Sequence, residues 1–256
     1  MLPELKDIAN PNDAEDVLVA FEPTTLDDTA KAVVGIENFS FVASYNWSND
    51  TKEPTIFVPG CPPRLTAPPL PTYVQKDTGV FYTDQNTARS QNATFDPFFK
   101  SLLAMNPQFD MNSISIVIDR KNLQQLLRFA SDYSNKSFTI DVDMINNTMF
   151  FTRREPNNYQ IIRESDNHGC GHEFEKAFTT LDKDLEDTTG HYRIVQYDLG
   201  GFKCLARYEA DAYIDEVPKP SNTRKGSLEE AFESQPRSRV SAPQISYGVK
   251  VIERGA

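Results

Sequence analysis

The sequence predicts an α+β protein with a central sheet of mixed or antiparallel strands and helices on its flanks. Strand-like segments rich in β-branched and aromatic residues recur along the chain, and between them apolar residues are spaced as in helices. Pairs of strand-like segments are joined by short Asn or Gly turns, as in antiparallel hairpins. The 256 residues, 39% of them hydrophobic, suffice for one large folded domain.

The first third of the chain predicts two strands and a helix. Residues 37–47 (ENFSFVASYNW) alternate apolar and polar positions, as in a strand with one buried face. The second strand, 55–58 (TIFV), precedes a proline-rich stretch that neither helix nor central strand can continue. A helix is expected over 95–107, with Asp96 as its N-cap.

The remaining elements alternate between strands and helices. A strand at 113–120 (SISIVIDR) leads into a helix at 122–132, whose leucines share one face. A hairpin is expected over 138–155, because Asn146-Asn147 suits a tight turn. A helix at 173–182 and a second hairpin at 191–214, turning at Gly200-Gly201, complete the predicted domain.

Composition divides the chain into four expected parts. Residues 1–35 are acidic and predict a flexible N-terminal arm, and residues 36–214 form the folded domain. Residues 215–244 are polar and rich in Pro and Ser, which predicts disorder. Residues 245–256 begin a strand on which the chain stops, so we expect a C-terminally truncated sequence.

Charge and cysteine content restrict the function. The net charge of −11 argues against broad, charge-driven binding of nucleic acid, but it permits a local basic groove or a site where metal ions contact phosphate. No preference for DNA is readable. Cys61, Cys170 and Cys204 form no closely spaced pair, which argues against a zinc site and favours reduced thiols. With neither a signal peptide nor an apolar run of membrane length, we expect an intracellular protein without a membrane partner, in the nucleus or the cytoplasm.

Two carboxylates near the end of the second hairpin are the main candidates for chemistry. In RYEAD, Glu209 and Asp211 are one residue apart on the expected strand and would point to the same face. Two ionised acids on a buried face repel each other and lose hydration, a cost that Mg²⁺ or Mn²⁺ offsets with its preference for oxygen ligands. The alternative is that both acids are hydrated at an exposed sheet edge.

Two more charged residues extend this candidate site. Glu175 follows a glycine at the start of an expected helix, in GHEFE. Arg120 lies between the expected strand and helix of IVIDRKNLQQLL, where a guanidinium can contact a phosphate.

The order of these motifs, from about residue 73 to residue 214, resembles the decapping exoribonuclease family of the PD-D/E-x-K nuclease superfamily. That family has a strand ending in Arg before a Leu-rich helix, a Gly-x-x-x-Glu phrase on a helix, and a strand ending in Glu-x-Asp. The resemblance implies a nuclease-like domain over 36–214 that hydrolyses RNA 5′ ends. It also implies catalytic roles for Arg120, Glu175, Glu209 and Asp211, of which the three acids bind Mg²⁺ or Mn²⁺.

The sequence departs from this family in two ways. The family has Trp before the Arg and Gly after it, whereas this chain has Asp119 and Lys121. The family's next motif, Glu-x-Lys, is missing, and its Lys positions or activates the attacking water, so we expect impaired catalysis. A similarity to fungal proteins labelled geranylgeranyl pyrophosphate synthase is set aside, because Asp27-Asp28 lacks the third Asp of a DDxxD motif and the chain is rich in predicted strands.

Three further groups have two interpretations each. HGCGH (168–172) is a turn into a helix or a pair of metal ligands. The aromatic residues of 41–47 belong to the core or stack on bases. Arg153, Arg154 and Arg163 are solvated edge charges or line a phosphate path.

Three hypotheses for function follow. The first is a metal-dependent nuclease-like enzyme that acts on an RNA 5′ end. The second is a module of the same fold without turnover, which binds an RNA end or a protein partner. The third is a globular protein with an unrelated role, whose carboxylates are merely exposed.

Overall fold

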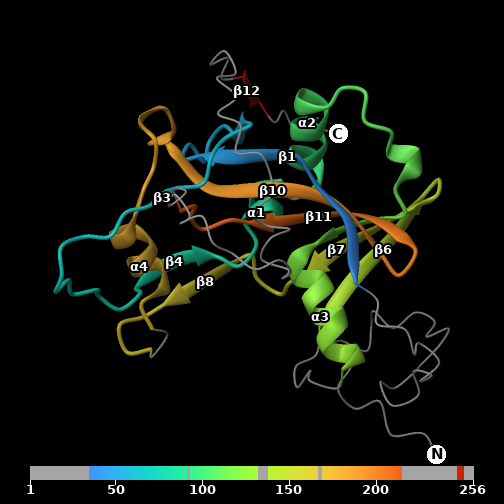
Figure 1. Cartoon of the computed structure of the whole chain (residues 1–256). Helices are drawn as coiled ribbons and strands as arrows, with labels where there is room; N and C mark the ends of the chain where they lie inside the picture. Colours follow the sequence, from blue (N-terminus) through green and yellow to red (C-terminus); the bar gives the residue numbers. More distant parts are fainter. Residues whose placement is uncertain (1–34, 91–92, 132–137, 167–168, 215–246, 251–256) are drawn as a thin grey trace, which may run out of the picture.

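The structure is a computed structural model that describes residues 35–90, 93–131, 138–166, 169–214 and 247–250. Within these residues the main element is an eight-stranded sheet in the order β12-β2-β1-β10-β11-β5-β7-β6 (Figure 1). Its strands are β1 (Ile36–Ser48), β2 (Thr55–Val58), β5 (Ile116–Asp119), β6 (Thr139–Ile145), β7 (Thr148–Arg154), β10 (Thr188–Leu199), β11 (Phe202–Glu209) and β12 (Tyr247–Lys250). β5 is parallel to both β11 and β7, and the other pairs are antiparallel. The predicted α+β class with a central mixed sheet is confirmed.

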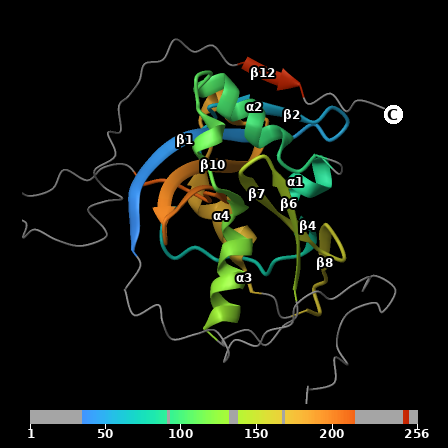
Figure 2. The ribbon, with the colours of Figure 1, turned by 90° about the vertical axis from the view of Figure 1, so that its right-hand side faces the viewer.

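Helices cover both faces of this sheet (Figures 1 and 2): α2 (Asp96–Met105) lies on one and α3 (Arg120–Ala130) on the other. Successive residues of a strand point to opposite faces. Val117 of β5 therefore packs in one core cluster with Phe98 of α2, whereas Ile118 packs in another with Leu123 of α3. The alternation of apolar residues in the central strands thus builds two core layers.

Four short elements lie beside the sheet and matter for the site. They form two small antiparallel pairs, β3 (Arg64–Leu65) with β9 (Thr179–Thr180) and β4 (Gly79–Tyr82) with β8 (Tyr159–Ile162). Two more helices, α1 (Gln85–Arg89) and α4 (Gly171–Phe178), and the 3-10 turns η2 (Met111–Ser113) and η3 (Lys183–Leu185) complete the described elements. Figure 1 shows α4 next to β4 and β8, and the rings of Phe81 and His172 stack between them at 4.0 Å. No helix among the described residues is long and apolar enough to cross a membrane.

Both predicted hairpins are confirmed. Asn146 has φ +54° between β6 and β7, and Gly200 and Gly201 have φ +59° and +85° between β10 and β11. These left-handed conformations favour Asn and Gly. The turn residues therefore identified both hairpins correctly.

Several predicted boundaries are wrong by a few residues. Asp96 is the first residue of α2 and not its N-cap, which is Phe95, and the Asp96 carboxylate pairs with Lys100 one turn later, 2.7 Å away. The helix expected over 173–182 ends at Phe178, since the next two residues pair with β3. The strand expected to reach Tyr213 ends at Glu209.

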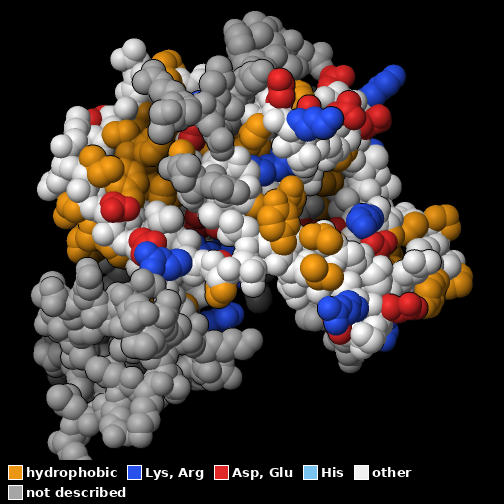
Figure 3. Space-filling view, turned by 180° about the vertical axis from the view of Figure 1, so that it is seen from behind, with side chains coloured by type: hydrophobic (Ala, Val, Ile, Leu, Met, Phe, Trp, Pro, Cys, Tyr) orange, Lys and Arg blue, Asp and Glu red, His pale blue; other side chains and the backbone are white. Residues whose placement is uncertain are grey.

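Two of the expected parts of the chain lie outside the described residues, namely residues 215–244 and all but one residue of the arm 1–35. In the last part, Tyr247–Lys250 forms β12, which pairs antiparallel with β2. At the opposite end of the sheet, β6 exposes Val142, Met144 and Ile145. Figure 3, a view from behind, shows hydrophobic side chains gathered toward this flank.

Candidate functional site

Three parallel strands bring polar residues to one edge of the sheet. β7, β5 and β11 run in the same direction, and their carboxyl ends carry Arg153, Asp119 and Glu209. β10 is antiparallel to β11, so Tyr192 near its start lies opposite Glu209. A pocket of about 820 Å³ opens at this edge and is lined by all four residues. Ligand sites of open sheets commonly lie at the carboxyl ends of parallel strands.

The same pocket is lined by all four residues that the sequence predicted as a site. Arg120 comes from the start of α3, Glu175 from α4, and Glu209 and Asp211 from the end of β11 and the segment after it. Each of these residues has surface exposed to solvent at the pocket wall, although the pocket buries part of the Glu175 and Glu209 carboxyls. The structure therefore brings the predicted residues together, while their catalytic roles stay predictions.

The geometry expected for the two neighbouring acids is wrong in one respect. Asp211 does not belong to the strand with Glu209, because β11 ends at Glu209 and the chain continues as an irregular segment. Ala210 still donates its N–H to the carbonyl oxygen of His191, at 2.8 Å. This bond keeps the segment along the pocket, so both acids still face it.

Backbone hydrogen bonds of residues 63–65 link the segment after α4 to the segment after β11. Leu65 in β3 donates its N–H to the carbonyl oxygen of Tyr213, at 2.8 Å, and Tyr213 donates to that of Pro63, at 2.9 Å. β3 also pairs with β9, which directly follows α4. Residues 63–65 thus lie between the two segments and bring Glu175 and Asp211 to the same pocket.

The start of α4 is held by a carboxylate far away in the sequence. Asp77 accepts the backbone N–H groups of His172, at 3.2 Å, and Glu173, at 2.9 Å. Burial alone would raise the pKa of Asp77, but these donors keep it below its ordinary value. The cap fixes the first turn of α4 and so places Glu175 one turn further on.

Two acids of the pocket, Glu209 and Glu175, hold their protons more tightly than an ordinary glutamate does. Burial, followed by the charges of Asp211 and Glu175, raises the pKa of Glu209 to about 7, against the opposing effects of Tyr192 and Arg120. Burial and the charge of Asp211 also raise the pKa of Glu175. Like charges that converge in this way favour a bound cation or proton.

The acids have the right chemistry for a hard cation, but the described residues do not enclose one. Glu175, Glu209 and Asp211 offer only oxygen donors, which Mg²⁺ and Mn²⁺ prefer. However, among the residues described, no three His, Cys, Asp or Glu side chains lie close enough together to hold a metal ion.

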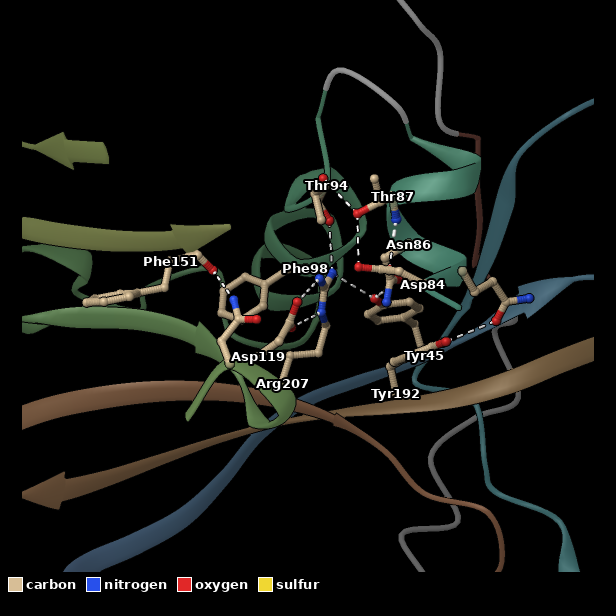
Figure 4. Close-up of polar contacts among 12 residues, drawn as sticks. Tyr45, Asp84, Asn86, Thr87, Thr94, Phe98, Asp119, Phe151, Tyr192 and Arg207 are labelled. Atoms are coloured by element: carbon tan, nitrogen blue, oxygen red, sulfur yellow. Dashed lines mark hydrogen bonds and ion pairs between the residues drawn. The ribbon is translucent and has the colours of Figure 1, made fainter. Parts of the chain in front are cut away.

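Below the acids, a buried ion pair that the sequence analysis missed forms the floor of the pocket. Arg207 is 1% exposed, and its Nε and Nη2 donate to the two carboxylate oxygens of Asp119 at 2.7 and 2.9 Å. Its Nη1 donates to the Tyr45 hydroxyl, at 3.2 Å, and to the Thr94 carbonyl oxygen, at 2.9 Å. Figure 4 shows Arg207 between Asp119 and Tyr45. Although burial disfavours its charge, Asp119 raises the pKa of Arg207, which keeps the guanidinium charged.

Aromatic and amide side chains complete this floor. The Tyr45 hydroxyl and the Trp47 indole N–H both donate to Asn86 Oδ1, at 2.6 and 3.0 Å. The rings of Tyr45 and Tyr192 stack at 5.2 Å, and Tyr45 and Trp47 are fully buried. The structure therefore supports the core interpretation for Tyr45 and Trp47, whereas Phe41 of the same strand is exposed.

The remaining candidates are distributed around the pocket. His172 lines it and stacks on Phe81, while His168 lies outside the described residues. Arg153 lines the pocket and pairs with Glu155. Arg154 lies on β7 outside the pocket lining and pairs with Asp141 at 2.9 Å. Arg153 therefore lies where an arginine that lines a phosphate path would be, whereas Arg154 does not.

One feature of the sequence could have predicted the buried ion pair on the floor of the pocket. Arg207 lies within the apolar run FKCLARY of a central strand, where a charge requires a partner. Asp119, the last residue of the neighbouring strand β5, is the acid that the sheet brings opposite it. No comparable signal marks Gln85 or Asn86, which reach the pocket from a short helix after β4.

Sequence comparison places residues 17–248 in the family described as "Domain of unknown function (DUF8563)", and the chain belongs to this family. No curated protein matches it. Among solved structures it is similar to S. pombe Rai1, with 15% identity and a TM-score of 0.48 over 77% of this chain and 59% of that one. S. pombe Rai1 in complex with 3'-FADP is 15% identical, with a TM-score of 0.48 over 77% of this chain and 60% of that one. A mutant of S. pombe Rai1 in complex with 3'-FADP is also 15% identical, with a TM-score of 0.45 over 73% of this chain and 56% of that one. The chain spans less than two thirds of the length of these structures.

Proposed function

We propose that this chain forms the site of a metal-dependent hydrolase that acts on the 5′ end of RNA. The observation that carries the proposal is the convergence of Arg120 with Glu175, Glu209 and Asp211 in one pocket at the carboxyl ends of parallel strands. The motif order that resembles the decapping exoribonuclease family supports the same activity.

Each residue has a role in this proposal. The Arg120 guanidinium contacts a phosphate of the RNA end, since it is exposed at the start of α3 and faces the acids across the pocket. The three acids bind Mg²⁺ or Mn²⁺, which relieves the repulsion that raises the pKa values of Glu175 and Glu209. The bound ion would supply an activated water for hydrolysis.

Metal binding is tested by thermal unfolding with and without Mn²⁺. We expect Mn²⁺ to raise the melting temperature of the wild type and to have no effect on the double variant Glu209→Gln, Asp211→Asn. Asp143→Asn, which removes an exposed acid on β6, is the matched control and should keep the Mn²⁺ response. An equal response in the double variant would exclude these acids as ligands.

Turnover is tested with RNA that carries a 5′-triphosphate, incubated with Mn²⁺ and resolved on a gel. Release of pyrophosphate or of nucleotides is the expected result, and the double variant should release neither. Unchanged RNA, together with an absent Mn²⁺ response, would remove the proposal of an enzyme.

The second candidate is a module of the same fold that binds an RNA end or a protein partner without turnover. It is favoured by the spacing of the acids, since the described residues form no group of three metal ligands. Binding of 5′-phosphorylated RNA without any product in the same incubation would support this candidate over the enzyme.

A further inference from the structure

An amide group in the wall of the pocket is buried without a partner for its nitrogen. Gln85 is the first residue of α1, is 5% exposed and lines the pocket. Among the described residues, its Nε2 has no hydrogen-bond partner. A buried donor without a partner destabilises the protein, so an acceptor atom brought by a ligand would be stabilised here.

The other end of the same amide is held in place. The Tyr192 hydroxyl donates to Gln85 Oε1 at 3.1 Å, and the Tyr192 ring is itself fixed by stacking on Tyr45 at 5.2 Å. Because the oxygen has this partner, the nitrogen is the free end of the amide. The amide is therefore oriented by the rigid floor of the pocket.

Gly190 brings this amide next to an acid of the site. A Cβ atom on Gly190 would lie 2.4 Å from Gln85 Oε1 and 3.1 Å from Glu209 Oε1. Both side chains therefore converge over the same glycine. The side chains of Gln85 and Glu209 are therefore neighbours in the pocket wall.

The chemistry of the amide nitrogen restricts the ligand. A primary amide nitrogen only donates hydrogen bonds, so it cannot bind a cation and requires an acceptor. Phosphate oxygens are such acceptors, and Arg120 on the same pocket supplies a positive charge for them. We propose that Gln85 is a substrate-binding residue that donates from Nε2 to an oxygen of the 5′ phosphate held beside Glu209, an inference that rests on the proposed function above.

The test compares two RNA probes with the full chain. The probes are short RNA oligonucleotides with a 3′ fluorescein, one with a 5′ monophosphate and one with a 5′ hydroxyl, measured by fluorescence anisotropy in Mn²⁺ with RNA length checked afterwards. The wild type should bind the phosphorylated probe more tightly. Gln85→Met, which keeps the side-chain length but lacks the donors, should weaken binding of that probe about tenfold and leave the hydroxyl probe unchanged.

A second variant at Gln85 tests the same role with a side chain that keeps the contact with Tyr192. Gln85→Glu keeps an acceptor for the Tyr192 hydroxyl, replaces the two donors with a carboxylate oxygen, and should abolish the preference for the phosphate. Gln125→Met, on α3 and away from the pocket lining, is the control and should bind both probes like the wild type. Melting temperatures confirm that the variants are folded.

The outcomes separate this inference from the proposed function. If the wild type binds the phosphorylated probe and a folded Gln85 variant keeps the full preference, the role of Gln85 is overturned and the proposed function stands. If the wild type shows no preference for the phosphorylated probe, both are overturned.

Discussion

Charges on the floor of the pocket are paired with opposite charges, whereas charges on the rim lie beside like charges. On the floor, Arg207 and Asp119 neutralise each other in a buried pair whose remaining donors have partners. The rim holds Glu175, Glu209 and Asp211, where burial and the charges of the neighbouring acids raise the pKa of the first two. The two regions are adjacent, since Arg207 and Glu209 are two residues apart on β11.

This difference separates the residues that stabilise the fold from those that can act on a ligand. A satisfied buried pair leaves no free group for a ligand, and removing one partner leaves an unpaired charge. Converging acids destabilise the folded state until a cation or a proton neutralises them. We therefore assign stability to the floor and ligand binding to the rim.

The largest expected effect comes from breaking the floor. Arg207→Met should lower the free energy of unfolding by about 3–5 kcal/mol, because it leaves the Asp119 carboxylate without its partner in a largely buried position. Urea unfolding followed by circular dichroism measures the loss.

An exposed arginine–aspartate pair provides the matched control. Arg154 and Asp141 pair at 2.9 Å with 56% and 42% of their side-chain surface exposed, so Arg154→Met should cost about 0–1 kcal/mol. Similar losses in the two variants would contradict the assignment of stability to the floor.

A substitution at Gly190 can separate the side chains of Gln85 and Glu209, which lie together over this glycine. This glycine has φ +61°, and Gly190→Ala would place a methyl group 2.4 Å from Gln85 Oε1. Gly201 has φ +85° with open space around it, so Gly201→Ala measures the backbone strain alone. We expect Gly190→Ala to be less stable than Gly201→Ala by about 1–3 kcal/mol in thermal or urea unfolding. Equal losses would mean that the packing over Gly190 is loose.

The smallest expected effect is the pH dependence of the rim. The pKa of Glu209 is raised to about 7, so the folded protein binds this proton more tightly than the unfolded chain, where Glu has a pKa of about 4.3. The contribution of Glu209 to the free energy of unfolding is therefore constant below about pH 4 and decreases as the pH rises to about 7.

Glu209→Gln removes this pH dependence. The variant should match the wild type at pH 4 and be more stable at pH 8, by about 1 kcal/mol or 2–4 °C after screening by solvent. Melting curves across this range in the absence of divalent metal measure the difference. A wild type as stable as the variant at pH 8 would show that neither burial nor the neighbouring acids raise the pKa of Glu209 in the folded protein.

Much of the fold could be predicted because its signals are local. The Asn146-Asn147 and Gly200-Gly201 turns identified both hairpins, and the leucines of 122–132 identified α3. Boundaries were less accurate where a distant segment competes for the backbone. The helix α4 ends early because Thr179 and Thr180 pair with β3, more than a hundred residues earlier in the chain.

The sequence alone predicted the longer strands and helices and both hairpins, since spacing and turn chemistry act over a few residues. It also named the acids and the arginine that the structure brings to one pocket. Only the tertiary structure decided that Glu175 and Asp211 meet, because residues 63–65 bond to both of their segments. It also decided that Asp119 neutralises Arg207 from the neighbouring parallel strand. Such contacts depend on which strands become neighbours in the sheet, and no local pattern specifies that order.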